Sequence, residues 1–230
     1  MSPIKKETKD AVRPSDVFYY IPNLIGYARV ILAAASFYYM PTSPWLCMGM
    51  YSVSVLLDAF DGKAARYFDQ CSKFGSVLDM VTDRCSTTGL MCYLAMVYPQ
   101  WAFAFQLLIS LDISSHYMHM YSSLTLGAKS HKAMDKSSNP ILRAYYTDQN
   151  ILFLFCACNE LFFQSLYLLS FDIHHLVFVG TAMELDLVLG MALLSGPICF
   201  GKQVISVVQL VGASKQLARV DADDKNGKDQ

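Results

Sequence analysis

The sequence contains DAFDGKAAR at residues 58–66 and, after a spacer of eight residues, GSVLDMVTD at residues 75–83. Together the two stretches fix eight positions, which are Asp58, Asp61, Gly62, Ala65, Arg66, Gly75, Asp79 and Asp83. With residue frequencies of about 5 to 8% each, a chance match to all eight is on the order of 10⁻⁹ per starting point. The pattern is therefore specific enough to support an argument about chemistry.

The four aspartates fall into two pairs with helical spacing. Asp58 and Asp61 are three residues apart, and Asp79 and Asp83 are four apart, so each pair lies on one face of its helix. An ionisable residue within a membrane helix costs roughly 2.5 to 3.5 kcal/mol, so four acids at that depth need compensating cations. Hard oxygen ligands favour Mg²⁺ or Mn²⁺, and two such ions about 3.5 to 4 Å apart could share these carboxylates. Sites of this kind act on phosphate esters.

Two further residues of the pattern suit a phosphate. Gly62 leaves room for a phosphate or a sugar to approach the backbone, and Arg66 offers a planar fork for phosphate oxygens. Together they suggest a diphosphate beside the metals. In the alternative reading, the acids form a solvated helix end and pair with neighbouring Lys and Arg, but that explains neither the spacing nor the membrane depth.

The composition is that of one multispan membrane domain. Of the 230 residues, 54% are hydrophobic and 16% charged, and the mean hydropathy is +0.32. The net charge of -1 gives no indication of a nucleic-acid partner. A spanning helix needs about 20 mostly apolar residues, and six segments qualify approximately: 17–39, 45–60, 74–97, 101–124, 150–171 and 181–211.

Basic residues support this count, because cytoplasmic connections are enriched in Lys and Arg. They fall in the N-terminal tail, in 61–73, in 127–143 and after Gly201, and the alternate connections contain none. We therefore expect both termini in the cytosol. The predicted organisation is a polar tail at 1–16 without a signal peptide, a six-helix domain at 17–212 and a C-terminal tail at 213–230, disordered from Asp221. The seven cysteines lack the spacing of a zinc or disulfide framework.

The pattern D-x-x-D-G-x-x-A-R, eight residues, G-x-x-x-D-x-x-x-D resembles the signature of the CDP-alcohol phosphatidyltransferase family at every fixed position. The resemblance implies an all-α fold of six transmembrane helices around a cytosol-facing polar cavity, two divalent ions (Mg²⁺ or Mn²⁺), a possible homodimer, and displacement of CMP from a CDP-linked donor by an alcohol. It implies that Asp83 is also the general base and that Gly62, Arg66 and Ser72 contact CDP-diacylglycerol. The implied metal ligands are Asp58, Asp61, Asp79 and Asp83.

Stretches beyond the signature bear on the acceptor alcohol. They resemble the eukaryotic branch of the family that uses myo-inositol, and they are PNLIGYAR (22–29), FGSVLDMVTDRCST (74–87), SLDISSH (110–116), SHKAMD (130–135), NPILRAYY (139–146) and NELF (159–162). This implies CDP-diacylglycerol and myo-inositol as substrates, phosphatidylinositol and CMP as products, a role in phospholipid biosynthesis, and residence in the endoplasmic reticulum membrane. Candidates for the inositol pocket are Lys132, Asp135, Asn139 and Arg143, although the positive-inside rule explains a basic loop equally well.

Several alternatives remain open at the level of sequence. Another acceptor, such as glycerol phosphate, is possible within the same family, and a divalent-cation transporter or an inactive scaffold is possible outside it. Arg66 argues against a transporter, because a cation pathway has no need of an arginine at its centre. Asn23 and Arg29 could line the nucleotide cavity, but a helix cap and a snorkelling arginine explain them equally well.

Overall fold

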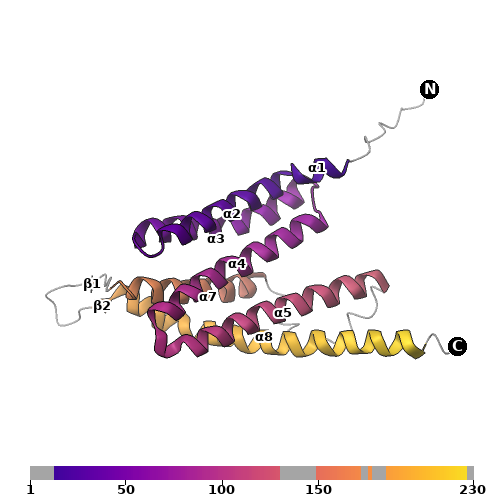
Figure 1. Cartoon of the computed structure of the whole chain (residues 1–230). Helices are drawn as coiled ribbons and strands as arrows, with labels where there is room; N and C mark the ends of the chain where they lie inside the picture. The colour runs from indigo at the N-terminus through magenta and orange to yellow at the C-terminus, as the bar shows by residue number, and fades with distance from the viewer. Residues whose placement is uncertain (1–12, 130–148, 172–175, 178–184, 227–230) are drawn as a thin grey trace, which may run out of the picture. The chain divides into compact units, whose positions relative to one another are not determined.

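The structure is a computed structural model, and it describes residues 13–129, 149–171, 176–177 and 185–226. These residues are almost entirely helical (Figure 1). The elements are α1 (Pro14–Phe18), α2 (Ile21–Tyr39), α3 (Pro44–Tyr67), α4 (Lys73–Val97), the 3₁₀ helix η1 (Pro99–Trp101), α5 (Ala102–Lys129), α7 (Gln149–Leu169), β1 (Leu176–Val177), β2 (Leu185–Asp186) and α8 (Leu187–Asn226). The chain divides into two compact units, Met1–Ser86 and Thr87–Gln230, and α4 passes from the first into the second.

In the first unit, α2 and α3 lie side by side (Figure 1). Each begins with a proline in its first turn. Backbone N–H groups there have no partner within the helix, so the missing N–H of proline costs no hydrogen bond. Buried residues recur at intervals of three, four or seven positions, which keeps them on one face of each helix, at Gly26, Arg29, Ala33 and Ser36 on α2 and at Cys47, Tyr51, Ser54 and Asp61 on α3. Most of them are small, and small residues allow close approach of membrane helices. The Ser54 hydroxyl donates to the Arg29 carbonyl at 3.0 Å, which joins the two backbones.

The turn after α3 also caps α2. Asp69 has a φ of 53°, the left-handed conformation that ends many helices. The next residue, Gln70, donates its backbone N–H to the Ala65 carbonyl at 2.9 Å, as in a Schellman motif. Its side-chain Oε1 accepts the N–H of Ile21 at 2.9 Å. The first residue of α2 is therefore held by the turn that connects α3 to α4.

Gly75 stands where α4 begins, and it has no room for a side chain. Its N–H donates to Ser72 Oγ at 2.9 Å, so Ser72 is the N-cap of α4. A Cβ on Gly75 would lie 2.7 Å from Asn23 Oδ1 and 3.0 Å from Ser72 Oγ. Asn23 is 1% exposed and has little freedom to move away.

We therefore expect Gly75→Ala to destabilise the protein by about 1 to 3 kcal/mol, the usual range for overpacking. Gly49→Ala is the matched control, because no atom lies within 4 Å of the added Cβ, and it should be neutral or stabilising by up to about 1 kcal/mol. Thermal unfolding of both variants in detergent measures the difference. Equal melting temperatures would contradict the close approach of α2 and α4.

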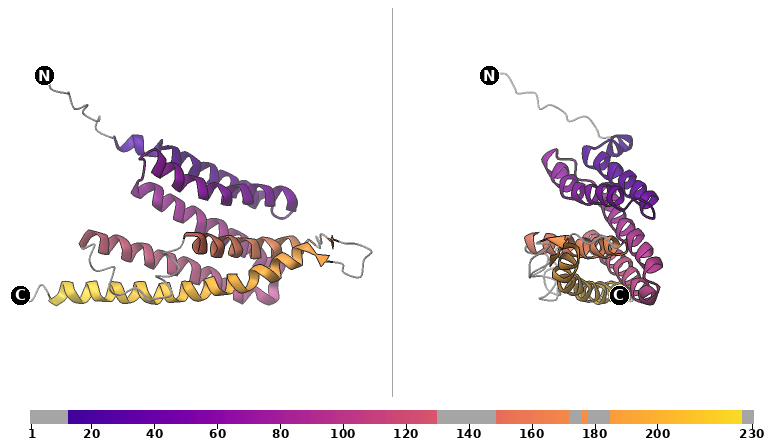
Figure 2. Two further views of the ribbon diagram at one scale, coloured as in Figure 1. Left: turned by 180° about the vertical axis from the view of Figure 1, so that it is seen from behind. Right: turned by 90° about the vertical axis from the view of Figure 1, so that its left-hand side faces the viewer.

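In the second unit, α8 packs against both α5 and α7 (Figure 2). Asp186 Oδ1 caps α8 by accepting the N–H groups of Val188 at 3.0 Å and Leu189 at 3.1 Å. Ser122 of α5 donates to Gln216 of α8 at 2.9 Å. Figure 2 shows α8 as one continuous helix that bends in its N-terminal part, and Pro197 lies in that part.

The helices place apolar side chains outside and many polar ones inside. Large exposed side chains include Ile31, Tyr38, Met96, Phe103, Leu194 and Phe200, each more than 65% exposed. This distribution suits a surface in contact with lipid rather than water. Among the described residues, α2, α7 from Asn150 onward and α8 are long and apolar enough to cross a membrane, and α4 with the following η1–α5 segment qualifies as a bent pair. Several apolar helices therefore fit a membrane protein.

The structure corrects four details of the expected organisation. A break between Phe18 and Ile21 divides the first expected span. The helix that carries Asp58 and Asp61 continues to Tyr67, beyond the expected end of the membrane span at Phe60. Leu185 and Asp186 form a strand paired with β1, although a helix was expected from residue 181. The expectation of disorder from Asp221 is wrong as far as Asn226, because α8 continues to that residue.

Candidate active site

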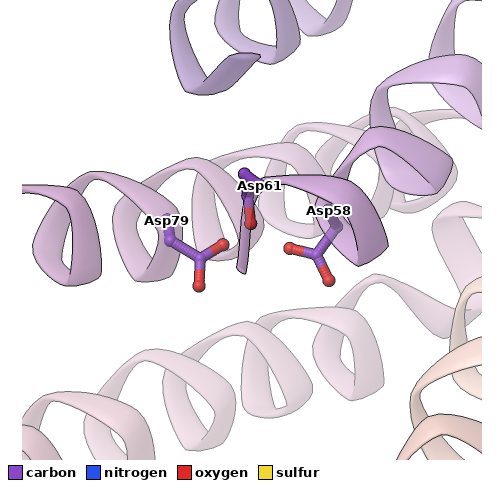
Figure 3. A group of neighbouring side chains, drawn as sticks. All are labelled: Asp58, Asp61 and Asp79. Carbon is purple, nitrogen blue, oxygen red and sulfur yellow. The ribbon is translucent and has the colours of Figure 1, made fainter. Parts of the chain in front are cut away.

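The first unit brings the four aspartates of the motif together. Asp58 and Asp61 lie on α3, and Asp79 and Asp83 lie on α4. Figure 3 shows Asp58, Asp61 and Asp79 facing a common space, and one oxygen from each lies within 4.8 Å of the others. Asp61 is the most buried of these three, at 7% exposure. The helical spacing of the two pairs therefore produces one acidic cluster from two helices.

Arg29 of α2 lies among all four carboxylates. Its Nη1 donates to Asp61 Oδ2 at 2.5 Å and to Asp79 Oδ1 at 2.7 Å. Its Nη2 pairs with Asp58 Oδ1 at 2.7 Å and with Asp83 Oδ1. The Arg29 side chain is 2% exposed, so it does not snorkel to the surface. Asp83 has a further ion pair with Arg84 at 3.5 Å.

The donor set suits a hard divalent cation. All its members are carboxylates, which is the ligand type that Mg²⁺ and Mn²⁺ prefer. Oxygens on opposite sides of a Mg²⁺ ion lie about 4.2 Å apart, since each bond is about 2.1 Å. Adjacent oxygens lie about 3.0 Å apart in an octahedral site, and at most two of any three oxygens can lie opposite each other. The oxygens of Asp58, Asp61 and Asp79, which lie within 4.8 Å of one another, would therefore have to approach by up to about 2 Å. Rotation of these three side chains could close the cluster around a divalent ion.

A cavity of about 240 Å³ adjoins the acidic cluster. Its walls include Asp61 and Asp79 and also the three residues predicted to contact the donor, Gly62, Arg66 and Ser72. Arg66 is exposed and, within the described part of the chain, has no hydrogen bond or ion pair. A Cβ on Gly62 would meet Arg66 Nη1 at 3.6 Å, an ordinary contact. The guanidinium of Arg66 is thus available to an anion in the cavity.

Asn23 also belongs to this site, although the sequence alone left open whether it lines the cavity or caps a helix. It is not a helix cap, because it lies inside α2, and its Nδ2 donates to the Val17 carbonyl at 2.5 Å. It also lines the cavity, and its Oδ1 is buried without a hydrogen-bond partner in the described structure. An acceptor buried without a partner is uncommon. The sequence could not predict this unpaired acceptor, because in the sequence Asn23 is only a polar residue near the start of an apolar span.

Polar residues of the stretches SLDISSH and NELF belong to the second unit. In the second unit, Glu160 accepts from Thr87 at 2.8 Å, and Asn159 accepts from Gln203 at 3.0 Å. Asp112 and His116 interact within α5, where His116 Nδ1 lies 2.8 Å from the Asp112 carbonyl oxygen. All seven cysteines are free thiols. The candidates for the inositol pocket, Lys132, Asp135, Asn139 and Arg143, fall outside the described residues.

Comparison with known proteins agrees with this site. Residues 19–183 match the family model described as CDP-alcohol phosphatidyltransferase, and the chain belongs to that family. It is 47% identical to a CDP-diacylglycerol–inositol 3-phosphatidyltransferase of Schizosaccharomyces pombe, over 96% of each chain. Proteins of the same name from Saccharomyces cerevisiae and Homo sapiens are 46% and 45% identical, over 97% and 91% of this chain and 97% and 96% of the relatives. No solved structure matches the chain.

Proposed function

We propose that this protein transfers the phosphatidyl group of CDP-diacylglycerol to myo-inositol, giving phosphatidylinositol and CMP. The observation that carries the proposal is identity of 45 to 47% over at least 91% of the chain with proteins named for that reaction. The geometry of the first unit supports it. A cavity lined by an available arginine and adjoining four carboxylates has the two features that a diphosphate with bound divalent ions requires.

Each motif residue has a role in the proposed mechanism. Gly62, Arg66 and Ser72 contact CDP-diacylglycerol, and the guanidinium of Arg66 takes its phosphate oxygens. Ser72 combines this contact with its role as the N-cap of α4, because its Oγ retains acceptor and donor capacity beyond the Gly75 N–H. The ligands of the two divalent ions, Mg²⁺ or Mn²⁺, are Asp58, Asp61, Asp79 and Asp83.

Asp83 is the general base of the reaction. Its carboxylate accepts the proton of an inositol hydroxyl, and the hydroxyl oxygen attacks the phosphorus that carries diacylglycerol. The bond from that phosphorus to the bridging oxygen of the diphosphate breaks, and CMP leaves. The chemistry supplied by the bound ions is neutralisation of negative charge on the diphosphate and on the departing CMP. Residues of α3 and α4 also hold the donor in place, which lowers the entropic cost of the step.

The membrane arrangement belongs to the same proposal. Six spans surround a cavity that opens to the cytosol, both termini are cytosolic, and the protein resides in the endoplasmic reticulum membrane. The expected oligomer is a homodimer. The distribution of Lys and Arg along the chain supports the orientation of the termini. The predicted division into 1–16, 17–212 and 213–230 follows from the same pattern.

The test is CMP release by the purified full chain in detergent with CDP-diacylglycerol and Mn²⁺ or Mg²⁺. Inositol, glycerol phosphate, serine and no acceptor are compared side by side. We expect release that depends on inositol and that stops when a chelator removes the divalent ions, because the carboxylates then have no cation to share with the diphosphate.

Each other outcome rejects a defined part of the proposal. Release with glycerol phosphate and not with inositol would keep the reaction class and change the acceptor. Release that persists in excess chelator would contradict the role of divalent ions. Absence of release with every acceptor, combined with divalent-cation flux in liposomes, would favour a transporter.

A further inference from the structure

The contacts of Arg29 have a regular arrangement. Nη1 lies between Asp61 of α3 and Asp79 of α4, and Nη2 lies between Asp58 of α3 and Asp83 of α4. Each terminal nitrogen thus joins one carboxylate from each helix. A single guanidinium holds both pairs of the motif, since its planar fork presents two nitrogens in a fixed geometry.

Attraction to the carboxylates determines the position of the Arg29 side chain, although one of its donors is left without a hydrogen bond. The third nitrogen, Nε, is buried and has no hydrogen-bond partner in the described structure. Most buried donors are paired, so the conformation leaves one donor unpaired while both terminal nitrogens reach the carboxylates. The backbone of Arg29 is fixed independently, because its carbonyl accepts from Ser54 Oγ at 3.0 Å.

The same carboxylates serve Arg29 and any divalent ion at this site. Asp58, Asp61 and Asp79 supply the oxygens that lie within 4.8 Å of one another, and each of these residues is also paired with Arg29 at 2.5 to 2.7 Å. A guanidinium at that distance neutralises part of the negative charge that would attract an ion to these carboxylates. Two cations at such close range also repel each other strongly when partly removed from water.

We propose that Arg29 is an internal counter-ion that holds the four aspartates together in the absence of divalent ions and loses its contacts with them as the ions bind. This inference rests on the proposed function, in which these aspartates are the metal ligands. Four carboxylates with Arg29 and Arg84 still leave a local excess of negative charge, which attracts divalent ions to the site. Arg29 therefore lowers the affinity for the ions and stabilises the ion-free protein.

The experiment compares wild type with Arg29→Gln in two measurements that do not depend on turnover. In titrations of the purified protein with Mn²⁺, followed by electron paramagnetic resonance of the free ion, we expect binding about tenfold tighter or more in the variant. In thermal unfolding with excess chelator, we expect a lower melting temperature for the variant, and a larger upward shift than in wild type when Mn²⁺ is added.

Lys63→Gln is the matched control, because it removes one positive charge from the helix that carries Asp58 and Asp61 without removing a contact to the four aspartates. The Lys63 ammonium lies over the Phe60 ring, 5.8 Å from its centre. Arg29→Lys provides a second variant if Arg29→Gln does not fold. Its single ammonium nitrogen cannot join both pairs of carboxylates, and we expect Mn²⁺ affinity between those of wild type and Arg29→Gln.

Unchanged or weaker Mn²⁺ binding in Arg29→Gln or Arg29→Lys, with normal binding in wild type, would overturn the inference and leave the proposed function intact. So would an equal increase in affinity in Lys63→Gln, because the effect would then be one of net charge. Absence of Mn²⁺ binding by wild type would overturn the metal site itself, and the inference with it.

Discussion

Asp61→Asn is expected to reduce inositol-dependent CMP release by about 10³-fold. A divalent ion contributes several kcal/mol to a phosphoryl-type transition state, and each 1.4 kcal/mol, roughly, corresponds to a factor of ten. Asp61 is the most buried carboxylate of the cluster that it forms with Asp58 and Asp79. Asparagine keeps the shape of the side chain but removes the charge on which ion binding depends. Steady-state CMP release at saturating substrates measures the effect.

Asp69→Asn is the matched control for this substitution. It is the same chemical change in the same unit, in the turn after α3. Asparagine tolerates the left-handed backbone conformation of that position, so we expect activity within about twofold of wild type. A comparable loss in Asp69→Asn would mean that removal of any acid in this region impairs the protein, and the specific role of Asp61 would be rejected.

Asp83→Asn is expected to reduce CMP release by about 10²- to 10⁴-fold, the usual contribution of a general base. The variant should still bind CDP-diacylglycerol. Loss of one of the four proposed ligands should weaken Mn²⁺ binding without abolishing it, because Asp58, Asp61 and Asp79 keep their oxygens within 4.8 Å of one another. Single-turnover CMP release and separate Mn²⁺ titrations distinguish loss of the base from loss of the ions.

Asp79→Asn is the comparison that distinguishes the role of a general base from the role of a metal ligand. Asp79 belongs to the group of three carboxylates and also lines the cavity, so its substitution should weaken Mn²⁺ binding and turnover together. If Asp83→Asn lost Mn²⁺ as completely as Asp79→Asn, the loss of turnover would be explained by the ions alone. The assignment of Asp83 as base would then have no support.

Much of the helical framework could be predicted from hydrophobicity, but the ends of the helices could not. Spans centred on α2, α4, α5 and α7 follow from long apolar runs, which resemble one another in any membrane helix. The extension of α3 to Tyr67 was missed because its last turn is polar, and a hydropathy argument ends a span where polarity begins. A helix can continue past that point as long as no residue breaks it. Likewise α8 continues through a charged segment to Asn226.

The residues of the candidate site were also predictable only in part. The grouping of Asp58, Asp61, Asp79 and Asp83 was predictable, because fixed spacing on two helices determines which faces carry acids. The arginine that pairs with these acids was not predictable. Arg29 precedes Asp58 by 29 residues in the sequence, and a lone arginine in an apolar span has several explanations. Charge alone would not have indicated it, because the Lys and Arg residues within and next to the motif are closer to the acids in the sequence.

The turn between α3 and α4 gives a physical reason for the length of the spacer in the motif. Tyr67 and Phe68 complete α3, Asp69 and Gln70 terminate it, and Ser72 starts α4, followed by Lys73 and Phe74 in its first turn. Of the eight spacer residues, only Cys71 has no position at a helix end. Each residue of a helix advances its side chains by about 100°. Loss of one residue would therefore rotate Asp79 and Asp83 away from α3, unless the turn itself rearranged. The length of the spacer is therefore set by the turn that it forms, and Ser72 is the spacer residue to which the proposed function also gives a contact with the donor.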